Sequence, residues 1–430
     1  MKRTSVIGIW ILVLLLLFTS CTGENAGMPE MSDQAAAAPE TGGTEDMGET
    51  EEPTPDAEPA QAPYLPGWDE EVPSLCETYD GVFRVGAAVN TAQLREGTDF
   101  YRLITRHYNT FVAENEMKPM YLNPSEGTFC FDAADRFVEF GEENDVLLRG
   151  HTLVWHSQAP DWWFLGEDGG RAESEQLLAR MEEYITTIVT RYKGRIHTWD
   201  VVNEAVSDSN GGLRRDSESS QYASIIGDLD GDGKDTDYIE KAFYWADAAD
   251  PDAQLILNDY SLESDVNKLN AFYKLAKELL EKGVPIDGAG IQAHIQIGYP
   301  SIAVFEMAIE KLAELKEISP DFTVQITELD VSIFDWGDQS TKKEPTPELQ
   351  TKLAERYADL FEMFRRQAEK GNLDMVVTWG VYDGRSWLDN YPVSGRTNAP
   401  LLFDRQMYTK PAFWGVIDRA LIPDAVAEMP

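Results

Sequence analysis

Two glutamates stand where apolar runs of the sequence end, and they are the residues best suited to chemistry. Glu204 closes HTWDVVNE (197–204), and Glu328 lies near the end of TVQITELD (323–330). An apolar run that ends on a carboxylate is typical of a buried strand holding an acid in a fixed position. Two carboxylates that face each other across a cleft can hydrolyse a glycoside: one, with a raised pKa, donates a proton, while the other attacks the anomeric carbon or activates water. We therefore expect Glu204 and Glu328 to form a catalytic pair.

Three polar residues near these glutamates could tune them. Asn203 directly precedes Glu204 and could donate a hydrogen bond to a sugar hydroxyl beside the reacting centre. His294 and Asp330 could form a chain that orients Glu328 and keeps it ionised, because a neighbouring cation favours the charged form of a carboxyl group. We therefore place His294 and Asp330 with the catalytic residues.

Tryptophans occur where they could hold a sugar. An indole ring presents a flat apolar face on which a pyranose ring can stack. Two tryptophans, Trp199 and Trp245, are expected in the core instead. Four others fall at the ends of apolar runs or in the loops that follow them: Trp155, Trp162, Trp379 and Trp387.

Other kinds of chemistry have weaker support. His151 and His156 are five positions apart, which is not the spacing of two metal ligands on one helix face, and the sequence has no HExxH or Cys/His ligand set. No nucleotide-binding glycine loop or nucleophile elbow occurs at a position where it could form a functional site. The formal net charge of −40 argues against nucleic acid or an anionic lipid surface as a partner, because both would repel the protein. A neutral substrate fits better.

Eight short apolar runs alternate with longer segments whose apolar residues recur every three or four positions. The runs are typical of buried strands and the longer segments of helices. This alternation favours a parallel sheet, and eight strands favour its closure into a (β/α)8 TIM barrel, in which all the carboxyl ends of the strands meet at one rim. The predicted strands span residues 83–89, 110–115, 146–155, 197–204, 254–260, 288–295, 323–330 and 375–381.

The first 72 residues differ in composition from the rest. Residues 1–21 have a basic start, an apolar run and small residues before Cys21, as in a lipoprotein-type signal peptide; a membrane-anchor helix is the alternative. Residues 22–72 contain fourteen Asp or Glu and no Lys or Arg, which is typical of a disordered, extended tether. We predict an exported protein, anchored to a membrane only through lipid at Cys21 or otherwise secreted, with its folded domain at residues 73–425.

Two further cysteines, Cys76 and Cys130, lie in the folded region. An exported compartment permits a disulfide between them. The spacing does not show that they meet, so two separate thiols are equally compatible with the sequence. We assign neither a catalytic role.

Six segments carry a pattern beyond these general features: ENEMK (114–118), RGHTLVWHSQ (149–158), WDVVNEA (199–205), GIQAHI (290–295), ITELD (326–330) and TWGVYD (378–383). In this order they resemble the signature segments of family 10 glycoside hydrolases, which are mostly endo-β-1,4-xylanases. The resemblance covers residues 75–420. It implies a (β/α)8 barrel that cleaves β-1,4-xylan with retention of anomeric configuration.

The resemblance also implies roles for individual residues. Glu204 looks like the acid/base and Glu328 like the nucleophile. Gln292 and His294 look like partners of the reacting centre, with Asp330 behind His294. Trp379 and Trp387 look like an aromatic lid over the sugar on the non-reducing side of the cut, and Gln158 and Tyr260 belong with the substrate-binding residues. The wall that grips the same sugar would consist of Glu114, Asn115, Lys118, His151, Trp155 and Asn203.

Two departures from the family pattern affect this transfer of roles. Ser261 replaces the usual asparagine after Tyr260, so contacts near the leaving-group sugar can differ. An insert, DLDGDGKDT (228–236), places Asp228, Asp230 and Asp232 at alternate positions before a glycine, like the opening of a calcium loop. We predict a structural Ca²⁺ on these three aspartates; an acidic surface turn is the alternative.

Together the residues predict an endo-acting xylanase that uses double displacement and requires no cofactor for catalysis. Its partners would be xylan and xylo-oligosaccharides, and we expect a monomer. A related barrel enzyme acting on another β-1,4-linked glucan is one alternative. A lipoprotein that binds sugar without cutting it is another, but binding alone would require neither Glu204 nor Glu328.

Overall fold

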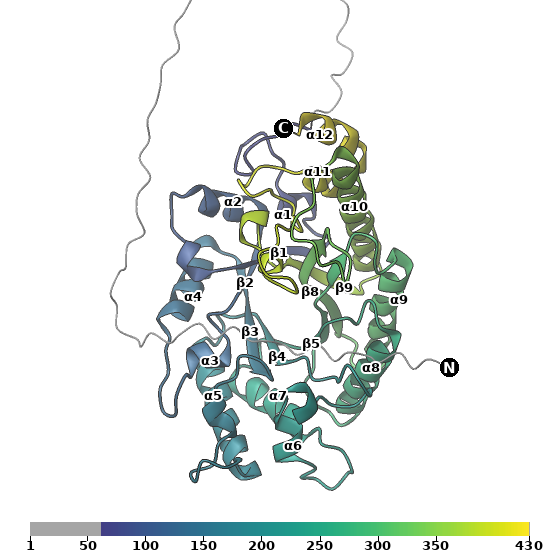
Figure 1. Ribbon diagram of the computed structural model, residues 1–430. Coiled ribbons are helices and arrows are strands. Elements are labelled where there is room, and N and C mark those ends of the chain that lie inside the picture. Colours follow the sequence, from purple (N-terminus) through teal and green to yellow (C-terminus); the bar gives the residue numbers. More distant parts are fainter. Residues whose placement is uncertain (1–61, 430) are drawn as a thin grey trace, which may run out of the picture. The chain divides into compact units, whose positions relative to one another are not determined.

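The computed structural model describes residues 62–429, and a closed parallel sheet lies at its centre (Figure 1). Its strands are rich in Val, Ile and Leu, as expected where both faces of a sheet are covered. The strands are β1 Arg84–Val89, β2 Thr110–Ala113, β3 Leu147–Trp155, β4 Thr198–Asn203, β5 Gln254–Asp259, β6 Gly288–Ile291, β7 His294–Gln296, β8 Thr323–Ser332 and β9 Leu373–Thr378.

Pairing between β6 and β8 closes the sheet into a barrel. Neighbouring strands pair in chain order from β1 to β6, and β9 pairs with both β1 and β8. All eight predicted strands are therefore confirmed, but the sixth is split into β6 and β7. The split occurs at Ala293, whose positive φ of 64° interrupts the strand, and β7 then continues beside the outer part of β8. The (β/α)8 fold is as the sequence predicted.

Helices surround the barrel on its outside (Figure 1). Side-chain caps mark where three of the longer helices begin: the side chains of Asp265, Ser301 and Thr346 accept hydrogen bonds from the first turns of α8, α9 and α10. The helices are α1 Leu75–Thr78, α2 Asp99–His107, α3 Pro119–Leu122, α4 Asp132–Asn144, α5 Ser174–Arg191, α6 Tyr222–Ile226, α7 Asp237–Ala249, α8 Val266–Glu281, α9 Ile302–Ala313, α10 Pro347–Glu369, α11 Pro411–Ile417 and α12 Ile422–Glu428.

Two glycines allow large groups to fill the space around the strands. A Cβ on Gly150 would lie 2.1 Å from the ring of Trp199, which is fully buried as predicted. A Cβ on Gly290 would lie 2.1 Å from the side-chain oxygen of Asn258. Because real Cβ atoms do not approach so closely, only glycine at 290 leaves Asn258 its place inside the barrel rim.

The folded chain begins before residue 73, so the predicted boundary is too late. The Gly67 N–H donates to the Met407 carbonyl at 2.8 Å, and Ala62 and Val72 are buried. Apolar residues in this short stretch can be buried against the barrel. The acidic composition of residues 22–72 as a whole did not indicate this. At the other end, α12 extends past residue 425 to Glu428. The predicted signal peptide and the rest of the tether lie outside the described residues.

Two smaller expectations concern membrane spans and disulfides. Within residues 62–429 no helix combines the length and the apolar character that crossing a bilayer requires. Over the same residues no disulfide joins Cys76 to Cys130. The sequence had left that pairing open, and the structure favours two separate cysteines.

Candidate active site

Glu204 and Glu328 lie at the carboxyl ends of two strands, as predicted. Glu204 directly follows β4, where its backbone has a positive φ of 57° and its N–H donates to the Asn258 carbonyl at 2.8 Å. Glu328 lies within β8, is 5% exposed, and its N–H donates to the Gln292 carbonyl at 3.0 Å. Backbone hydrogen bonds to neighbouring strands thus fix both glutamates at the barrel rim.

Three amide side chains connect the two carboxylates. Gln292 Nε2 donates to Glu204 Oε1 at 3.0 Å and lies 3.3 Å from Asn203 Oδ1. Asn258 Nδ2 donates to the same Asn203 oxygen at 2.8 Å and to Glu328 Oε1 at 3.0 Å. Because the Asn203 oxygen accepts from both amides, a continuous hydrogen-bonded bridge runs from Glu204 to Glu328. The barrel has therefore brought together two acids that are 124 positions apart in sequence.

His294 lies between two acids and contacts the second carboxylate oxygen of Glu328. His294 Nε2 lies 3.2 Å from Glu328 Oε2, and His294 Nδ1 lies 3.0 Å from Asp330 Oδ2. Trp387 Nε1 donates to the same Asp330 oxygen at 2.8 Å. Burial lowers the pKa of His294, but the charges of Asp330 and Glu328 outweigh it and raise the pKa to about 10. His294 is thus a cation at neutral pH, and its charge lies beside Glu328 Oε2.

Glu204 has a different neighbour, His156, whose Nε2 lies 3.8 Å from Glu204 Oε2. Burial lowers the pKa of His156 to about 4, so this ring is uncharged at neutral pH. Burial also raises the pKa of Glu204, but charge on His156, the Gln292 donor and the Arg214 charge together hold it below its ordinary value. Because His156 is charged only in acid, the Gln292 hydrogen bond and the Arg214 charge are among the groups that still lower the pKa of Glu204 near pH 7. The expectation of a raised pKa for the acid is therefore not met in the unliganded protein.

Lys118 is a buried cation beside this pair. Its Nζ donates to Gln158 Oε1 at 2.9 Å and to Asn115 Oδ1 at 3.1 Å. Nζ also lies over the ring of Trp155, 5.0 Å from its centroid. Burial lowers the pKa of Lys118 to about 8, although Glu328 and other nearby carboxylates oppose the shift. The predicted residues Asn115, Lys118, Trp155 and Gln158 therefore form one group.

Two more predicted wall residues are held by charged partners. Glu114 Oε2 lies 3.5 Å from Arg385 Nη2. His151 Nδ1 lies 2.9 Å from Asp200 Oδ2, and Arg149 donates to that oxygen at 3.0 Å from within the barrel. This buried pair fixes the orientation of the His151 ring, which lies edge-on to Trp379 with centroids 5.3 Å apart.

Tyr260, predicted near the leaving-group sugar, belongs to a charged cluster behind Glu204. Arg214 Nη2 donates to its hydroxyl at 2.8 Å, and the hydroxyl donates to Asp208. Lys268 Nζ lies 3.3 Å from the centroid of the Tyr260 ring and also contacts Asp208. Arg214 also donates to the Glu204 carbonyl at 3.1 Å, so the same side chain contacts both the cluster and the backbone of Glu204.

The four tryptophans expected at the rim divide into two kinds. Trp155, Trp379 and Trp387 adjoin Lys118, His151 and His294, as described above. Trp162 does not join them: its Nε1 donates to the Asn123 carbonyl at 3.1 Å and its ring packs under Arg180. Trp162 is therefore not part of the group around Glu204 and Glu328, and sugar binding by Trp162 stays a prediction.

The acidic insert brings together only two of its three predicted ligands. Carboxylate oxygens of Asp228 and Asp230 lie within 4.8 Å of each other and of one from Asp237. Asp232 instead pairs with Lys282 Nζ at 2.7 Å, and the same ammonium contacts Asp230 and Glu240. A lysine thus already neutralises part of this loop. The calcium ion stays a prediction.

Some residues of this site were missed by reasoning from sequence. Asn258 had a signal, because it ends a strand beside Asp259, but only the fold shows that its amide joins the two glutamates. His156 was considered only as a metal ligand. Arg214 and Asp208 lie in a loop without a pattern, and no feature of the sequence connects them to Glu204.

The chain is similar to a described protein family and to several named proteins. Residues 74–419 match the family described as glycosyl hydrolase family 10. Endo-1,4-beta-xylanase C of Paenibacillus barcinonensis is 43% identical over 83% of this chain and 32% of its own length. The chain therefore spans about a third of that relative. Endo-1,4-beta-xylanase B of the same organism is 41% identical over 81% of this chain and 98% of its own length.

Solved structures agree with the sequence comparisons. A family 10 structure from Paenibacillus barcinonensis has 43% identity and a TM-score of 0.79, covering 82% of this chain and 99% of its own. Xylanase B from Clostridium stercorarium F9 has 40% identity and a TM-score of 0.73, covering 81% and 100%. Both similarities extend over nearly all of the described barrel.

Proposed function

Because the chain belongs to glycosyl hydrolase family 10, we propose that it is an endo-1,4-β-xylanase that cleaves xylan and xylo-oligosaccharides with retention of configuration. One observation carries the proposal: the bridge of Gln292, Asn203 and Asn258 that joins Glu204 to Glu328. Two carboxylates held this way at the end of a barrel match the arrangement that glycoside hydrolysis requires.

In the first step Glu328 attacks the anomeric carbon while Glu204 protonates the departing oxygen. The bond to the leaving sugar breaks and a covalent sugar ester forms on Glu328. In the second step Glu204, now ionised, takes a proton from water, and that water attacks the anomeric carbon and frees Glu328. Retention follows because the carbon is inverted twice.

Glu204 must carry a proton before the first step, although its pKa is low in the unliganded protein. A sugar chain in the cleft excludes water, and loss of water favours the neutral carboxyl group. His156 is uncharged at neutral pH and so does not oppose this proton. Substrate binding is thus the step that prepares the acid.

The sugar on the non-reducing side of the cut would lie against Glu114, Asn115, Lys118 and His151, with Trp379 and Trp387 over it. Buried cations and amides suit hydroxyl groups, and indole rings suit the flat face of xylose. Catalysis by these side chains uses no cofactor. Ca²⁺ would act only on the insert, and a melting temperature that rises with Ca²⁺ and falls with a chelator would support it.

We propose that the protein is exported and held at a membrane surface by lipid on Cys21, and that it acts as a monomer. The composition of residues 1–21 supports the first part. Replacing Cys21 by serine should move the protein from the detergent phase to the aqueous phase on partitioning. Light scattering of the purified protein tests its oligomeric state.

Proton NMR of the anomeric signals tests the reaction itself. In the first minutes of digestion of a xylo-oligosaccharide, β-configured product should appear before its α form. α-Product first would remove Glu328 from the role of nucleophile. If no xylo-oligosaccharide is cut but another β-1,4-glucan is, the protein acts on that polymer; if neither is cut, it binds sugar without hydrolysis.

A further inference from the structure

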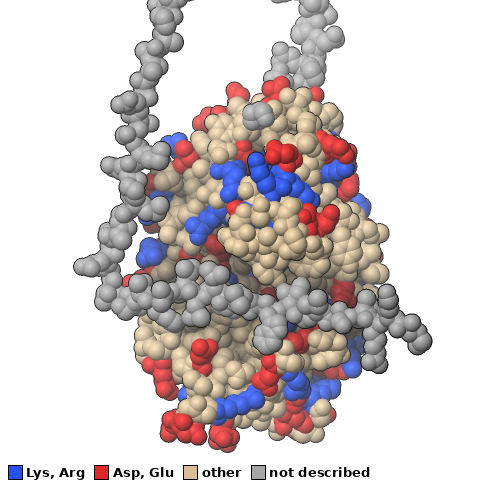
Figure 2. All heavy atoms as spheres, viewed as in Figure 1, with Lys and Arg blue, Asp and Glu red and all other residues tan. Residues whose placement is uncertain are grey.

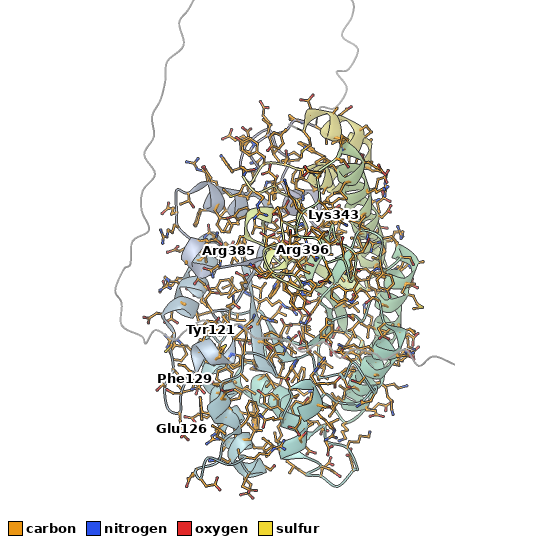
Figure 3. The ribbon with its side chains drawn as sticks, in the orientation of Figure 1. Tyr121, Glu126, Phe129, Lys343, Arg385 and Arg396 are labelled. Atoms are coloured by element: carbon orange, nitrogen blue, oxygen red, sulfur yellow. The ribbon has the colours of Figure 1, made fainter. Side chains whose placement is uncertain are left out.

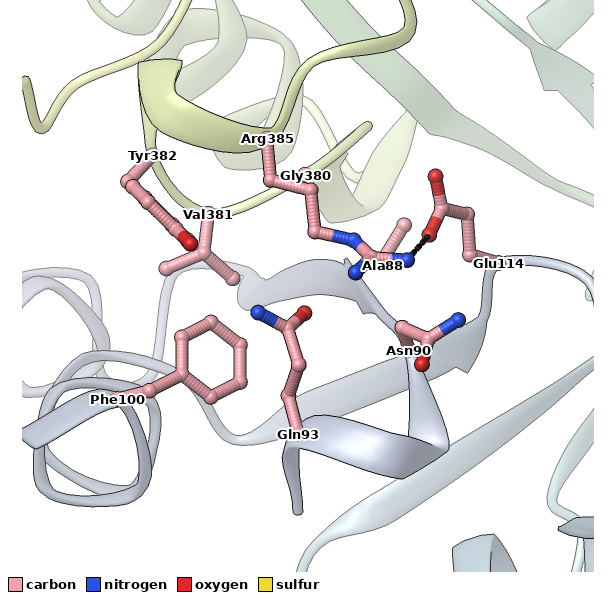
Figure 4. A pocket seen from close by; sticks show the side chains of 9 residues that line it. All are labelled: Ala88, Asn90, Gln93, Phe100, Glu114, Gly380, Val381, Tyr382 and Arg385. Carbon is pink, nitrogen blue, oxygen red and sulfur yellow. Dashed lines mark ion pairs between the residues drawn. The ribbon is translucent and has the colours of Figure 1, made fainter. Parts of the chain in front are cut away.

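A pocket beside the proposed sugar-binding wall has no role in the reaction described above (Figure 4). It is open to solvent on one side, and its empty volume of about 240 Å³ includes that open space. It lies between the ends of β1, β2 and β9 and shares Glu114 with the wall. Its lining consists of Ala88, Asn90, Gln93, Phe100, Glu114, Gly380, Val381, Tyr382 and Arg385.

Arg385 is the charged group that this pocket offers to a ligand. Its side chain is 46% exposed, and Glu114 is its one ionic partner among the described residues, at 3.5 Å from Nη2. A guanidinium group has five N–H donors in a planar fork. One nitrogen of Arg385 faces Glu114, so the other edge of the fork remains available to an incoming carboxylate.

The remaining walls offer both polar and apolar groups to a ligand at the mouth of this pocket. Asn90 uses its Oδ1 to accept from the Ala92 N–H at 3.0 Å, which leaves its Nδ2 as a donor. Figure 4 shows Gln93 and Tyr382 pointing into the same space. The ring of Phe100 packs against that of Tyr382, with centroids 6.0 Å apart, and forms an apolar side. Donors on one side and an apolar ring on the other are what sugar rings require.

The position of Arg385 matters because the protein as a whole is acidic. With a formal net charge of −40, the chain repels anionic substrates at long range. Figure 2 shows basic side chains gathered on the upper part of the face in view, and Figure 3 places Arg385, Arg396 and Lys343 there. Arg396 is buried and donates to the Ser340 carbonyl. Arg385 is thus the more available of these two arginines.

We propose that this pocket binds an acidic sugar substituent of the substrate, a uronic acid side group on the non-reducing side of the cut, and that Arg385 recognises its carboxylate. The inference rests on the proposed function, because Glu114 connects the pocket to the sugar wall only if that wall holds xylan. Charge-assisted Arg–carboxylate hydrogen bonds are strong and directional, so they separate acidic from neutral side groups. Arg385 would make the enzyme selective for acidic xylan.

The test compares three oligosaccharides that share one β-1,4-xylose backbone. One is linear, one carries a single uronic acid, and one carries the methyl ester of that acid, which has nearly the same shape but no charge. The wild-type kcat/KM should be about tenfold higher for the acid than for the ester, the size expected of one charge-assisted hydrogen bond. Mass spectrometry should find the acid on the non-reducing-side fragment.

Arg385→Gln should bring the acid-to-ester ratio close to one. Arg405→Gln is the matched control, because it removes the same charge from a nearby loop, where Arg405 pairs with Asp389 outside the pocket. The control should keep the ratio. A wild-type ratio near one, or an unchanged ratio in Arg385→Gln, would overturn the proposal.

Failure of the proposed function gives a different result. If no oligosaccharide is cut, the xylanase proposal falls, while calorimetric titration with the acid and its ester still decides whether the pocket prefers the acid. Tighter binding of the acid that disappears in Arg385→Gln supports the pocket. Equal binding of both rejects it.

Discussion

At the scale of residues, Glu204 and Glu328 differ in how their two oxygens are occupied. Glu328 accepts from Asn258 on one oxygen and faces the charged His294 on the other. Glu204 accepts from Gln292 on one oxygen, while its other oxygen faces the uncharged His156. A proton can occupy that second oxygen without displacing a cation. These surroundings favour the proposed roles, attack by Glu328 and proton transfer by Glu204.

This division predicts a dependence on the leaving group. Glu204→Ala should lower kcat/KM on xylo-oligosaccharides by about 10²–10⁴-fold, the usual contribution of a general acid. It should reduce formation of the covalent intermediate much less with an aryl xylobioside whose phenol leaves without protonation. Pre-steady-state release of phenol measures this step. Equal losses on both substrates would show that Glu204 is not the proton donor.

Lys118 predicts a loss of binding in alkali. Its pKa of about 8 means that the ammonium group loses its proton as pH rises through 8, and the charge beside the sugar wall is lost. KM should therefore rise above pH 8 more than kcat falls. Lys118→Arg keeps its charge to much higher pH, so its KM should stay level across this range even if it starts higher. The same alkaline rise in the variant would point to another group.

At the scale of elements, the sequence predicted every strand because each is a short apolar run, but it did not predict which side chains at the strand ends hydrogen-bond to one another. The carboxyl ends of β4, β5 and β8 supply Asn203, Asn258 and Glu328, and their meeting depends on barrel closure. Asp232 shows the opposite case. Its spacing suggested a metal ligand, but α8 delivers Lys282 from 50 positions away to pair with it. Local patterns carry no information on such distant partners.

Lys282 predicts how the insert responds to loss of its cation. The ammonium lies within 3.2 Å of carboxylate oxygens of Asp230, Asp232 and Glu240 and is 27% exposed. Lys282→Met should lower stability by about 1–2 kcal/mol, since partly exposed pairs contribute less than about 1 kcal/mol each. Differential scanning calorimetry should show a melting temperature lower by a few degrees. Ca²⁺ should restore more of it in the variant than it adds to the wild type; Lys352→Met, which breaks an exposed pair on α10, is the control.

At the scale of the whole described chain, residues 62–72 form hydrogen bonds with an early helix of the barrel and with a segment near its C-terminus. Gly67 bonds to Met407 near the C-terminus, and Arg106 at the end of α2 donates to the Val72 carbonyl at 3.0 Å. Composition hid this segment because it is part of residues 22–72, which contain fourteen acids. The few apolar side chains that decide its packing are too sparse to form a period, so only their tertiary partners reveal it.

His107 makes this attachment sensitive to acid. Its Nε2–H donates to the Gly67 carbonyl at 2.6 Å, and its Nδ1 accepts from the Leu75 N–H at 3.3 Å, so the buried ring is satisfied only when neutral. Burial lowers its pKa to about 4, against about 6.5 in the unfolded chain. The unfolded state therefore binds the proton first, and stability should fall as pH drops from 6.5 to 4, by about 3 kcal/mol from this group.

Denaturant titrations between pH 7 and 4 test this sign. His107→Phe should be less stable than wild type at pH 7, because the Gly67 carbonyl and the Leu75 N–H lose their partner. Its stability should then decline less steeply in acid, so that the two proteins converge near pH 4. Arg106→Gln weakens the same segment but keeps the titrating ring, and its acid slope should match the wild type. Parallel slopes for His107→Phe and wild type would show that acid acts elsewhere.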